Sequence, residues 1–154
     1  MLLPPQTITR AVSSKVRASI FNKLDVEGKR VLDLFAGGGT LGLEAISNGA
    51  VEATFVDKSE KAVTVIKKNI KSLGLTTQVK VRKSEVLKFS DNLGLKYDVI
   101  FLDPPYKQFT NTLVKTASNL LQLGGILVVS CSSRSNVEPP QGTSQLSQKI
   151  YGDT

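Results

Sequence analysis

The sequence predicts an α/β fold, a mostly parallel twisted sheet with helices on both faces. Two observations carry this prediction. Short apolar runs alternate along the chain with stretches of helical periodicity, which is the pattern of consecutive strand–helix–strand units. The run over 97–102 is almost continuously apolar, as in a strand that is covered on both faces. Ligands of such sheets bind at the carboxyl ends of the strands, so functional side chains are expected there.

The first half of the chain is predicted to alternate between helices and strands. Val16, Ile20 and Leu24 recur at helical spacing after Ser13 and Ser14, either of which could cap a helix. Glycines stop the later helices. In chain order, the expected elements are a helix over 13–24, a strand over 30–35, a helix over 40–48, a strand over 53–56, a helix between Ser59 and Gly74, and a strand over 79–81.

The second half continues the alternation. We expect a strand over 97–102, a helix over 113–123 that Gly124 and Gly125 break, and a fifth strand over 126–131. Cys131 would lie inside that strand as a small buried thiol. Residues 132–147 are rich in Ser, Gln and Pro and are predicted to form a loop, and residues 150–154 resemble the approach to a further strand.

Composition limits the classes of function. The 154 residues, of which 40% are hydrophobic, suit a single domain over 1–154. The absence of His excludes His metal sites and His general bases, and the single Cys131 excludes an internal disulfide. Without a signal peptide or an apolar run of about 18 residues, a cytoplasmic protein is expected. The net charge of +7 favours phosphate-rich partners.

A glycine-rich turn follows the predicted strand over 30–35. The run from Gly37 to Gly42 fits G-x-G-x-x-G and opens a predicted helix, so its backbone can approach a ligand closely. Asp57 stands twenty residues after Gly37, at the end of the next strand, where a carboxylate can accept hydrogen bonds from both hydroxyls of a ribose. This arrangement predicts a nucleoside cofactor, and a tight turn without any ligand is the structural alternative.

Asp33 helps to separate two cofactor classes. A carboxylate four residues before the first glycine is unfavourable beside a dinucleotide's pyrophosphate but suits a cofactor that bears a cationic amino acid and a sulfonium. A cap for a helix or loop is the alternative role of Asp33. A nicotinamide oxidoreductase is further disfavoured because the chain has no His and no evident Tyr-x-x-x-Lys pair.

The tetrapeptide from Asp103 to Tyr106 is the most informative in the chain. Its two prolines stiffen the backbone directly after a buried strand. The Asp103 carboxylate and the Pro104 carbonyl could accept the two hydrogens of an amino group on a planar base, while Tyr106 stacks on the ring. Such hydrogen bonds make a conjugated amine a better nucleophile, and methyl transfer to it depends mainly on positioning and electrostatics. A proline-rich turn with an Asp cap is the structural alternative.

These motifs resemble those of the amino-methyltransferases of DNA and RNA. More narrowly, nearly the whole chain is similar to the bacterial 16S ribosomal RNA guanine-N2 methyltransferases, which are class I S-adenosylmethionine-dependent enzymes with a Rossmann-like fold. The residues that carry the likeness are Arg10, Ser13 to Arg17, Phe21, Asn22, Asp33 to Ala45, Asp103 to Tyr106 and Tyr151 to Thr154.

The resemblance implies S-adenosyl-L-methionine as cofactor and a guanine of small-subunit ribosomal RNA as methyl acceptor, without a metal. The implied catalytic residues are Asp103, Pro104 and Tyr106. The residues implied to contact the cofactor are Asp33, Phe35, Ala36, Gly37, Gly39, Asp57, Lys58, Ser84, Glu85 and Asp103. Substrate contacts are expected from Arg10, Lys15, Arg17, Pro105 and Tyr106.

The chain departs from the family pattern at several positions. Arg10-Ala11-Val12 and Arg17-Ala18 replace the usual Arg-Pro-Thr and Arg-Glu, and Ser84-Glu85 stand where many class I enzymes have an Asp for the adenine amino group. Adenine recognition is thus left open between Glu85, Ser84 and a backbone N–H. The family also extends past both ends of this sequence, so a trimmed chain or a minimal member is expected.

The size of the domain bears on the substrate. Little surface remains beyond the cofactor and base pockets, so we expect ribosomal RNA within a partly assembled small subunit as the partner, and a monomeric enzyme that recognises shape. An adenine-N6 DNA methyltransferase shares both motifs and remains an alternative. A nucleic-acid-binding module with a vestigial cofactor site needs only the positive charge and is the alternative outside the enzymes.

Overall fold

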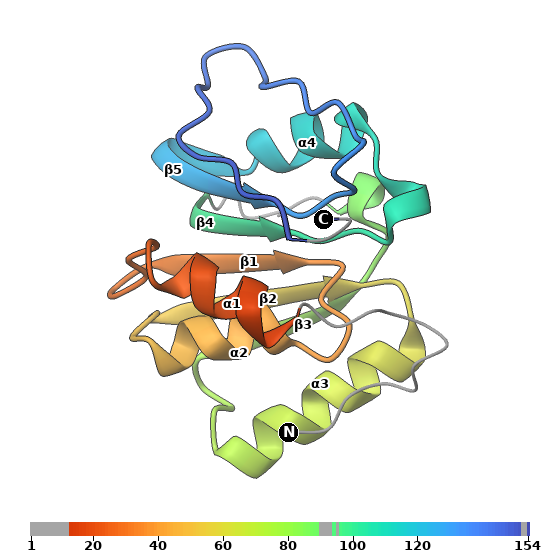
Figure 1. Cartoon of the computed structure of the whole chain (residues 1–154). Helices are drawn as coiled ribbons and strands as arrows, with labels where there is room; N and C mark the ends of the chain where they lie inside the picture. Colours follow the sequence, from red (N-terminus) through yellow and green to blue (C-terminus); the bar gives the residue numbers. More distant parts are fainter. Residues whose placement is uncertain (1–12, 90–93, 95, 152–153) are drawn as a thin grey trace.

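A computed structural model describes residues 13–89, 94, 96–151 and 154 of the protein. Five strands form one sheet in the order β3-β2-β1-β4-β5, and every neighbouring pair is parallel (Figure 1). The strands are β1 (Arg30–Leu34), β2 (Glu52–Asp57), β3 (Val79–Lys83), β4 (Tyr97–Leu102) and β5 (Leu121–Val129). The predicted α/β class is confirmed, and the winding of the chain reverses between β1 and β4, where such sheets bind ligands.

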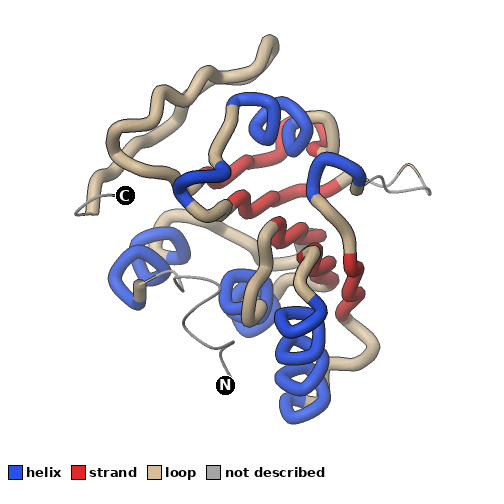
Figure 2. Tube along the Cα trace, turned by 90° about the vertical axis from the view of Figure 1, so that its right-hand side faces the viewer, coloured by secondary structure: helices blue, strands red, loops and turns tan. Residues whose placement is uncertain are grey.

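Helices lie on both sides of the strands (Figure 2). They are α1 (Ser14–Phe21), α2 (Thr40–Ser47), α3 (Glu60–Leu73) and α4 (Asn111–Ser118), with two 3-10 turns, η1 (Val86–Lys88) and η2 (Tyr106–Gln108). Side chains of α1, α2 and α3 pack into one hydrophobic cluster, and those of α4 and η1 pack into a second cluster on the other face. The sheet is therefore buried between two layers, as the apolar character of its strands predicts.

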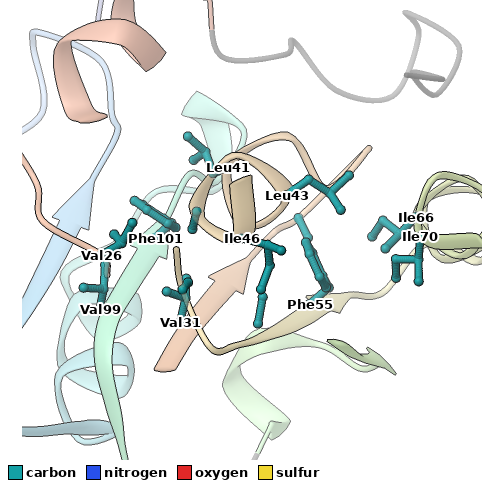
Figure 3. Close-up of a cluster of buried hydrophobic side chains, with 14 of the residues drawn as sticks. Val26, Val31, Leu41, Leu43, Ile46, Phe55, Ile66, Ile70, Val99 and Phe101 are labelled. Atoms are coloured by element: carbon teal, nitrogen blue, oxygen red, sulfur yellow. The ribbon is translucent and has the colours of Figure 1, made fainter. Parts of the chain in front are cut away.

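The close approach of α2 to the sheet depends on a glycine. Phe55 of β2 is fully buried between α2 and the side chains of Ile66 and Ile70 from α3 (Figure 3). A Cβ atom at Gly42 would clash with the Phe55 ring. The last glycine of the G-x-G-x-x-G pattern thus serves helix–strand packing, which is one of the roles expected of it.

The N-terminal helix is shorter than the predicted helix over 13–24. Ser13 caps α1 by accepting a hydrogen bond of 3.3 Å from the backbone N–H of Val16, and the helix ends at Phe21. Leu24 and Val26 are buried in the core as part of the connection to β1. Burial of Leu24 explains the apolar periodicity that extended the predicted helix.

The predicted boundary between the last helix and strand is wrong. α4 ends at Ser118 and β5 begins at Leu121, so residues 121–123 are extended rather than helical. The pairing of β4 with β5 shifts register between Tyr97 and Val99, and Gly124 has a φ of +76°. The two glycines therefore lie at an irregularity inside β5 instead of before it. Cys131 lies beyond the end of β5 and is only partly buried, which corrects its predicted place inside the strand.

The remaining predicted helices and strands over 30–83 and 97–102 are confirmed within a few residues. The expected approach to a further strand over 150–154 stays a prediction, because residues 152 and 153 lie outside the described residues. Ser59 caps α3, Gly74 ends it in a left-handed conformation, and residues 132–147 form neither helix nor strand. In the part of the chain that the structure describes, no helix combines the length and the apolar character that crossing a bilayer requires.

Candidate functional site

Several predicted site residues lie at the end of the sheet that is formed by the carboxyl ends of its strands, which we call the carboxyl edge. Phe35 follows β1, Asp57 is the last residue of β2, Ser84 follows β3, and Asp103 follows β4. Since all strands are parallel, these residues lie at one edge although they are up to 68 positions apart in the chain. The structure thus brings together the glycine turn, its acid and the Asp-Pro-Pro-Tyr segment.

The glycine turn has an unusual backbone. Phe35 has a φ of +59°, the only positive value at a non-glycine residue in the described chain, and Gly37 has a φ of +57°. The N–H of Ala36 donates to the Val56 carbonyl at 3.1 Å, which anchors the turn to β2. A left-handed conformation is costly for an aromatic residue, so the surroundings must hold Phe35 in place.

Asp57, at the end of β2, holds this turn in place by a hydrogen bond. Its side chain is buried, and one carboxylate oxygen accepts the N–H of Gly37 at 2.9 Å while the other accepts the N–H of Ser59 at 2.8 Å. A carboxylate has about four acceptor positions, so about two remain for hydroxyl groups of a ligand. Asp57 therefore shapes the turn, and its contact with a ribose stays a prediction.

Asp33 is almost completely buried beneath α2. Its carboxylate accepts the N–H of Gly42 at 2.9 Å, which caps α2 because the N-cap residue Gly39 has no side chain. Burial raises the pKa of Asp33 well above its usual value, and the nearby Asp103 and Asp57 carboxylates raise it further against the opposing Gly42 hydrogen bond. The capping role is thus seen, and the concentration of negative charge makes the site receptive to a cation.

Asn69 is a site residue that sequence reasoning missed. It lies on the buried face of α3 with 1% of its surface exposed, and its side-chain amide donates to the Gly38 carbonyl at 3.1 Å. A polar residue among Ile66 and Ile70 on an apolar helix face was the available signal. Asn69 ties the glycine turn to the third helix.

The Asp-Pro-Pro-Tyr segment forms the other side of the site. Burial raises the pKa of Asp103, against the effect of a hydrogen bond with Ser130 after β5. Pro104 is buried, and Pro105 precedes the short turn η2 that begins at Tyr106. The Tyr106 hydroxyl is hydrogen-bonded to that of Thr154. The rigid turn therefore carries a carboxylate and an aromatic ring three positions apart, at its two ends.

The other residues predicted to contact cofactor or substrate differ in their position and in their partners. Ser84 donates its N–H to the Asp57 carbonyl at 3.1 Å and lies at the edge, while Glu85 is paired with Lys88 at 3.0 Å. Arg17 forms an ion pair with Glu44 at 3.5 Å. The ammonium of Lys15 lies 5.8 Å from the centre of the Tyr151 ring. Both basic side chains thus have partners within the protein.

Arg10 and Lys58 are the last two of the predicted site residues. Arg10 lies outside the described residues. Lys58 follows Asp57 and is exposed. Within the described ranges, no group of three or more His, Cys, Asp or Glu side chains is placed to hold a metal ion.

The chain is similar to known methyltransferases. A model of the family described as "Conserved hypothetical protein 95" matches residues 1–154. Ribosomal RNA small subunit methyltransferase D of Buchnera aphidicola subsp. Acyrthosiphon pisum is 36% identical over 115 residues, which cover 73% of this chain and 59% of that protein. This chain spans 57% to 59% of the length of three curated relatives, of which two carry that name and one is named putative rRNA methyltransferase YlbH.

Solved structures give the same fold. Hypothetical protein TTHA0928 of a Thermus species is 30% identical, with a TM-score of 0.82 over 99% of this chain and 88% of that one. An S-adenosylmethionine-dependent methyltransferase of Thiobacillus denitrificans, solved with S-adenosyl-L-homocysteine, is 22% identical, with a TM-score of 0.69 over 80% of this chain and 50% of that one. The fold is thus that of the Rossmann-like class I methyltransferases.

Proposed function

This chain belongs to the family described as "Conserved hypothetical protein 95", and we propose that it methylates the exocyclic amino group of a guanine in small-subunit ribosomal RNA, with S-adenosyl-L-methionine as methyl donor. One observation carries the proposal. The turn after β1, which Asp57 organises, and the Asp-Pro-Pro-Tyr turn after β4 meet at the reversal point of the sheet. Relatives named ribosomal RNA small subunit methyltransferase D support the choice of RNA.

The glycine turn fits the proposed cofactor. Asp57 has acceptor capacity left for two ribose hydroxyls, and Ser84 with Glu85 lies beside it, where the adenine would extend. The buried Asp33 makes this part of the site favourable for positive charge, which the sulfonium and the amino group of S-adenosyl-L-methionine carry. Phe35, Ala36, Gly37 and Gly39 would line the same pocket.

The Asp-Pro-Pro-Tyr turn would hold the base. Bound S-adenosyl-L-methionine supplies an electrophilic methyl group, so the protein must orient an amine against it and withdraw a proton. Asp103 and the Pro104 carbonyl accept the two amine hydrogens, which moves electron density toward nitrogen, and Tyr106 fixes the ring by stacking. Pro105 would line the base pocket beside them.

The proton balance involves Asp103. As the carbon–nitrogen bond forms and the carbon–sulfur bond breaks, nitrogen becomes acidic and one proton must leave. Burial raises the pKa of Asp103, so its carboxylate is a stronger base than an exposed one and can take that proton, as water also can. A base within paired RNA would first have to leave its stack.

The proposal also covers the assembly in which the RNA is methylated. A domain of this size presents little surface for reading sequence, so we infer a partly assembled small subunit as partner and a monomeric enzyme of the cytoplasm. The test supplies labelled methyl donor with naked small-subunit ribosomal RNA, with unmethylated small subunits, and with duplex DNA at one salt concentration, followed by nucleoside analysis. Methylguanosine from the subunits is the expected product. Methyladenine in duplex DNA would overturn the substrate assignment.

A further inference from the structure

The positive charge of the chain is concentrated in one segment. Residues 58–88 contain nine Lys and Arg residues and two Glu residues, a balance of +7. The whole chain also has a balance of +7, so the remaining residues are neutral overall. The segment comprises α3, the edge strand β3 and the turn η1. The charge that predicts a phosphate-rich partner therefore belongs to one part of the fold.

This segment lies at one end of the molecule. α3 is at the opposite end of the fold from α4, beside the edge strand β3 (Figure 1). The buried face of α3 packs its apolar side chains into the core. At about 100° per residue, its four lysines fall within an arc of about 120° on the opposite side. These exposed lysines are Lys61, Lys67, Lys68 and Lys71.

Most cations of the segment form no ion pair with any acid that the structure describes. Glu60 pairs with Lys83 at 2.6 Å, Glu85 pairs with Lys88 at 3.0 Å, and Lys80 pairs with Glu52 of β2 at 2.8 Å. Among the residues that the structure describes, no ion pair within 4.0 Å is found for six others, which are all exposed. Five of them lie on α3 or directly before it, and we call these five the basic face. It consists of Lys58, Lys61, Lys67, Lys68 and Lys71. The sixth cation is Arg82, which alternates along β3 with Val81 and Lys83; those two face α3, so Arg82 lies on the other side of the sheet.

The basic face contrasts with the predicted phosphate contacts of the N-terminal segment. There Arg17 is held by Glu44, and Lys15 lies over the Tyr151 ring. Lysines four positions apart on one helix, such as Lys67 and Lys71, repel each other by a few tenths of a kcal/mol. An anionic partner along α3 would remove that repulsion.

We propose that the basic face docks the phosphate backbone of the RNA substrate, as a second contact outside the site where the base is methylated. The proposal rests on the proposed function. Five exposed cations, four on a helix about 21 Å long and one directly before it, can neutralise several phosphates of a folded RNA without reading its sequence. Lys58 follows Asp57, so the face begins beside the cofactor pocket and leads away from it.

The chemistry of the face favours RNA over two other partners. A membrane-bound amphipathic helix must turn its apolar side outward, whereas that side of α3 is packed against the sheet. Protein interfaces use aromatic and apolar anchors, whereas the outward side of α3 presents lysines. Lysine ammonium groups on flexible stems suit phosphates as mobile point charges.

The test compares two variants of equal net charge. One replaces Lys67, Lys68 and Lys71 with Gln. The matched control replaces Lys23, Lys115 and Lys149, which are exposed on other elements, with Gln. Binding of a small-subunit ribosomal RNA transcript is measured at several salt concentrations between about 50 and 200 mM. Circular dichroism and calorimetry with S-adenosyl-L-homocysteine report the fold and the cofactor pocket.

The α3 variant is expected to reduce the slope of log affinity against log salt by about three and to weaken RNA binding at least about tenfold at the lowest salt. The control should retain the parent's slope, and both variants should bind S-adenosyl-L-homocysteine as the parent does. Equal losses of RNA affinity in both variants would show that only the net charge of the protein matters, which would overturn the proposal. An unchanged slope in the α3 variant would also overturn it.

Two further outcomes separate this proposal from the proposed function. If the α3 variant binds naked RNA normally but loses affinity for assembled small subunits, the face contacts a protein and the RNA assignment is wrong. If the parent methylates guanine in small subunits while the α3 variant keeps its salt slope, the docking proposal alone fails. Methylation of duplex DNA by the parent would instead overturn the proposed function.

Discussion

The side-chain amide of Asn69 donates a 3.1 Å hydrogen bond to the carbonyl oxygen of Gly38, which joins the third helix to the turn after the first strand. Asn69 is buried, so an apolar replacement leaves the Gly38 carbonyl without this donor. Such a loss costs about 1–3 kcal/mol. The same turn carries the Gly37 N–H that donates to Asp57. Asn69 therefore supports both the shape of the turn and the proposed cofactor pocket.

Asn69→Leu should therefore weaken cofactor binding as well as the fold. We expect about a tenfold loss of affinity for S-adenosyl-L-homocysteine, measured by calorimetry. Thr54→Val is the matched control, because it removes a buried hydrogen bond from the Tyr97 hydroxyl on the other face of the sheet. A similar loss of affinity in both variants would show that Asn69 acts through stability alone.

Asp57→Ala should bind the cofactor poorly. The change removes the acceptors for the Gly37 and Ser59 N–H groups together with the proposed ribose contacts. Hydrogen bonds to a charged group are worth about 1.5–3 kcal/mol, which corresponds to about a tenfold to hundredfold loss of affinity. Calorimetry checks this, with Asp57→Asn as the variant that keeps the side chain's shape. Affinity equal to the parent's in Asp57→Ala would refute the placement of the ribose.

Asp103→Ala should affect chemistry more than binding. Its contact with the amine strengthens as nitrogen becomes nucleophilic, so the transition state loses more stabilisation than the bound ground state. Single-turnover measurements should give a methyl-transfer rate at least about a hundredfold lower. Affinity for S-adenosyl-L-homocysteine should stay near that of the parent. A variant that loses affinity but keeps the rate would assign Asp103 to the cofactor instead.

Tyr106→Phe should retain much of the turnover, while Tyr106→Ala should retain little, because stacking on a base requires the ring and not the hydroxyl. The hydroxyl bonds to Thr154, so Thr154→Val should reproduce the small effect of Tyr106→Phe. Steady-state rates on small subunits measure all three variants. Equal losses in Tyr106→Phe and Tyr106→Ala would assign the function to the hydroxyl.

Asp33 should make stability depend on pH. Burial raises its pKa in the folded protein, so the folded state binds that proton more tightly than the unfolded chain does. The free energy of unfolding should then fall as pH rises from the ordinary Asp pKa of about 3.9 through the raised pKa. Urea unfolding at several pH values should show Asp33→Asn losing less stability over this window than the parent. Parallel curves would mean that Asp33 ionises alike in both states.

The sequence predicted the elements whose patterns are local. The start of the third helix at Ser59, its stop at Gly74 and the glycine turn all depend on neighbours within a few positions, and the structure confirms them. The cap of the first helix, which the sequence left open between two serines, is Ser13. The end of α4 was missed because Leu121 and Leu123 continue a helical pattern, while pairing with β4 draws this stretch into the sheet. The last strand is thus set by a distant partner.

In the candidate site too, local sequence patterns predicted some residues, while others depend on distant partners. Asp33, Asp57 and Asp103 could be placed at the carboxyl edge because each stands at or near the end of a predicted strand. Asn69 could not be linked to Gly38, since the two are thirty-one positions apart and come together through the packing of α3 against the sheet. The sequence shows that residues 58–88 are rich in Lys and Arg. Only the structure shows that Arg17 is paired with Glu44, while the lysines of the basic face have no ion pair among the described residues.

The strand order also governs how this protein is made. β1 pairs with both β2 and β4, and the pairing with β4 closes a long stretch of chain that contains α2, α3 and β3. During synthesis from the N-terminus, the half that holds the glycine turn and Asp57 leaves the ribosome before the half that holds Asp103. One flank of β1 then stays without its neighbour until β4 emerges. A nascent chain paused there exposes an unpaired, apolar strand edge, which is the kind of surface that chaperones and aggregation compete for.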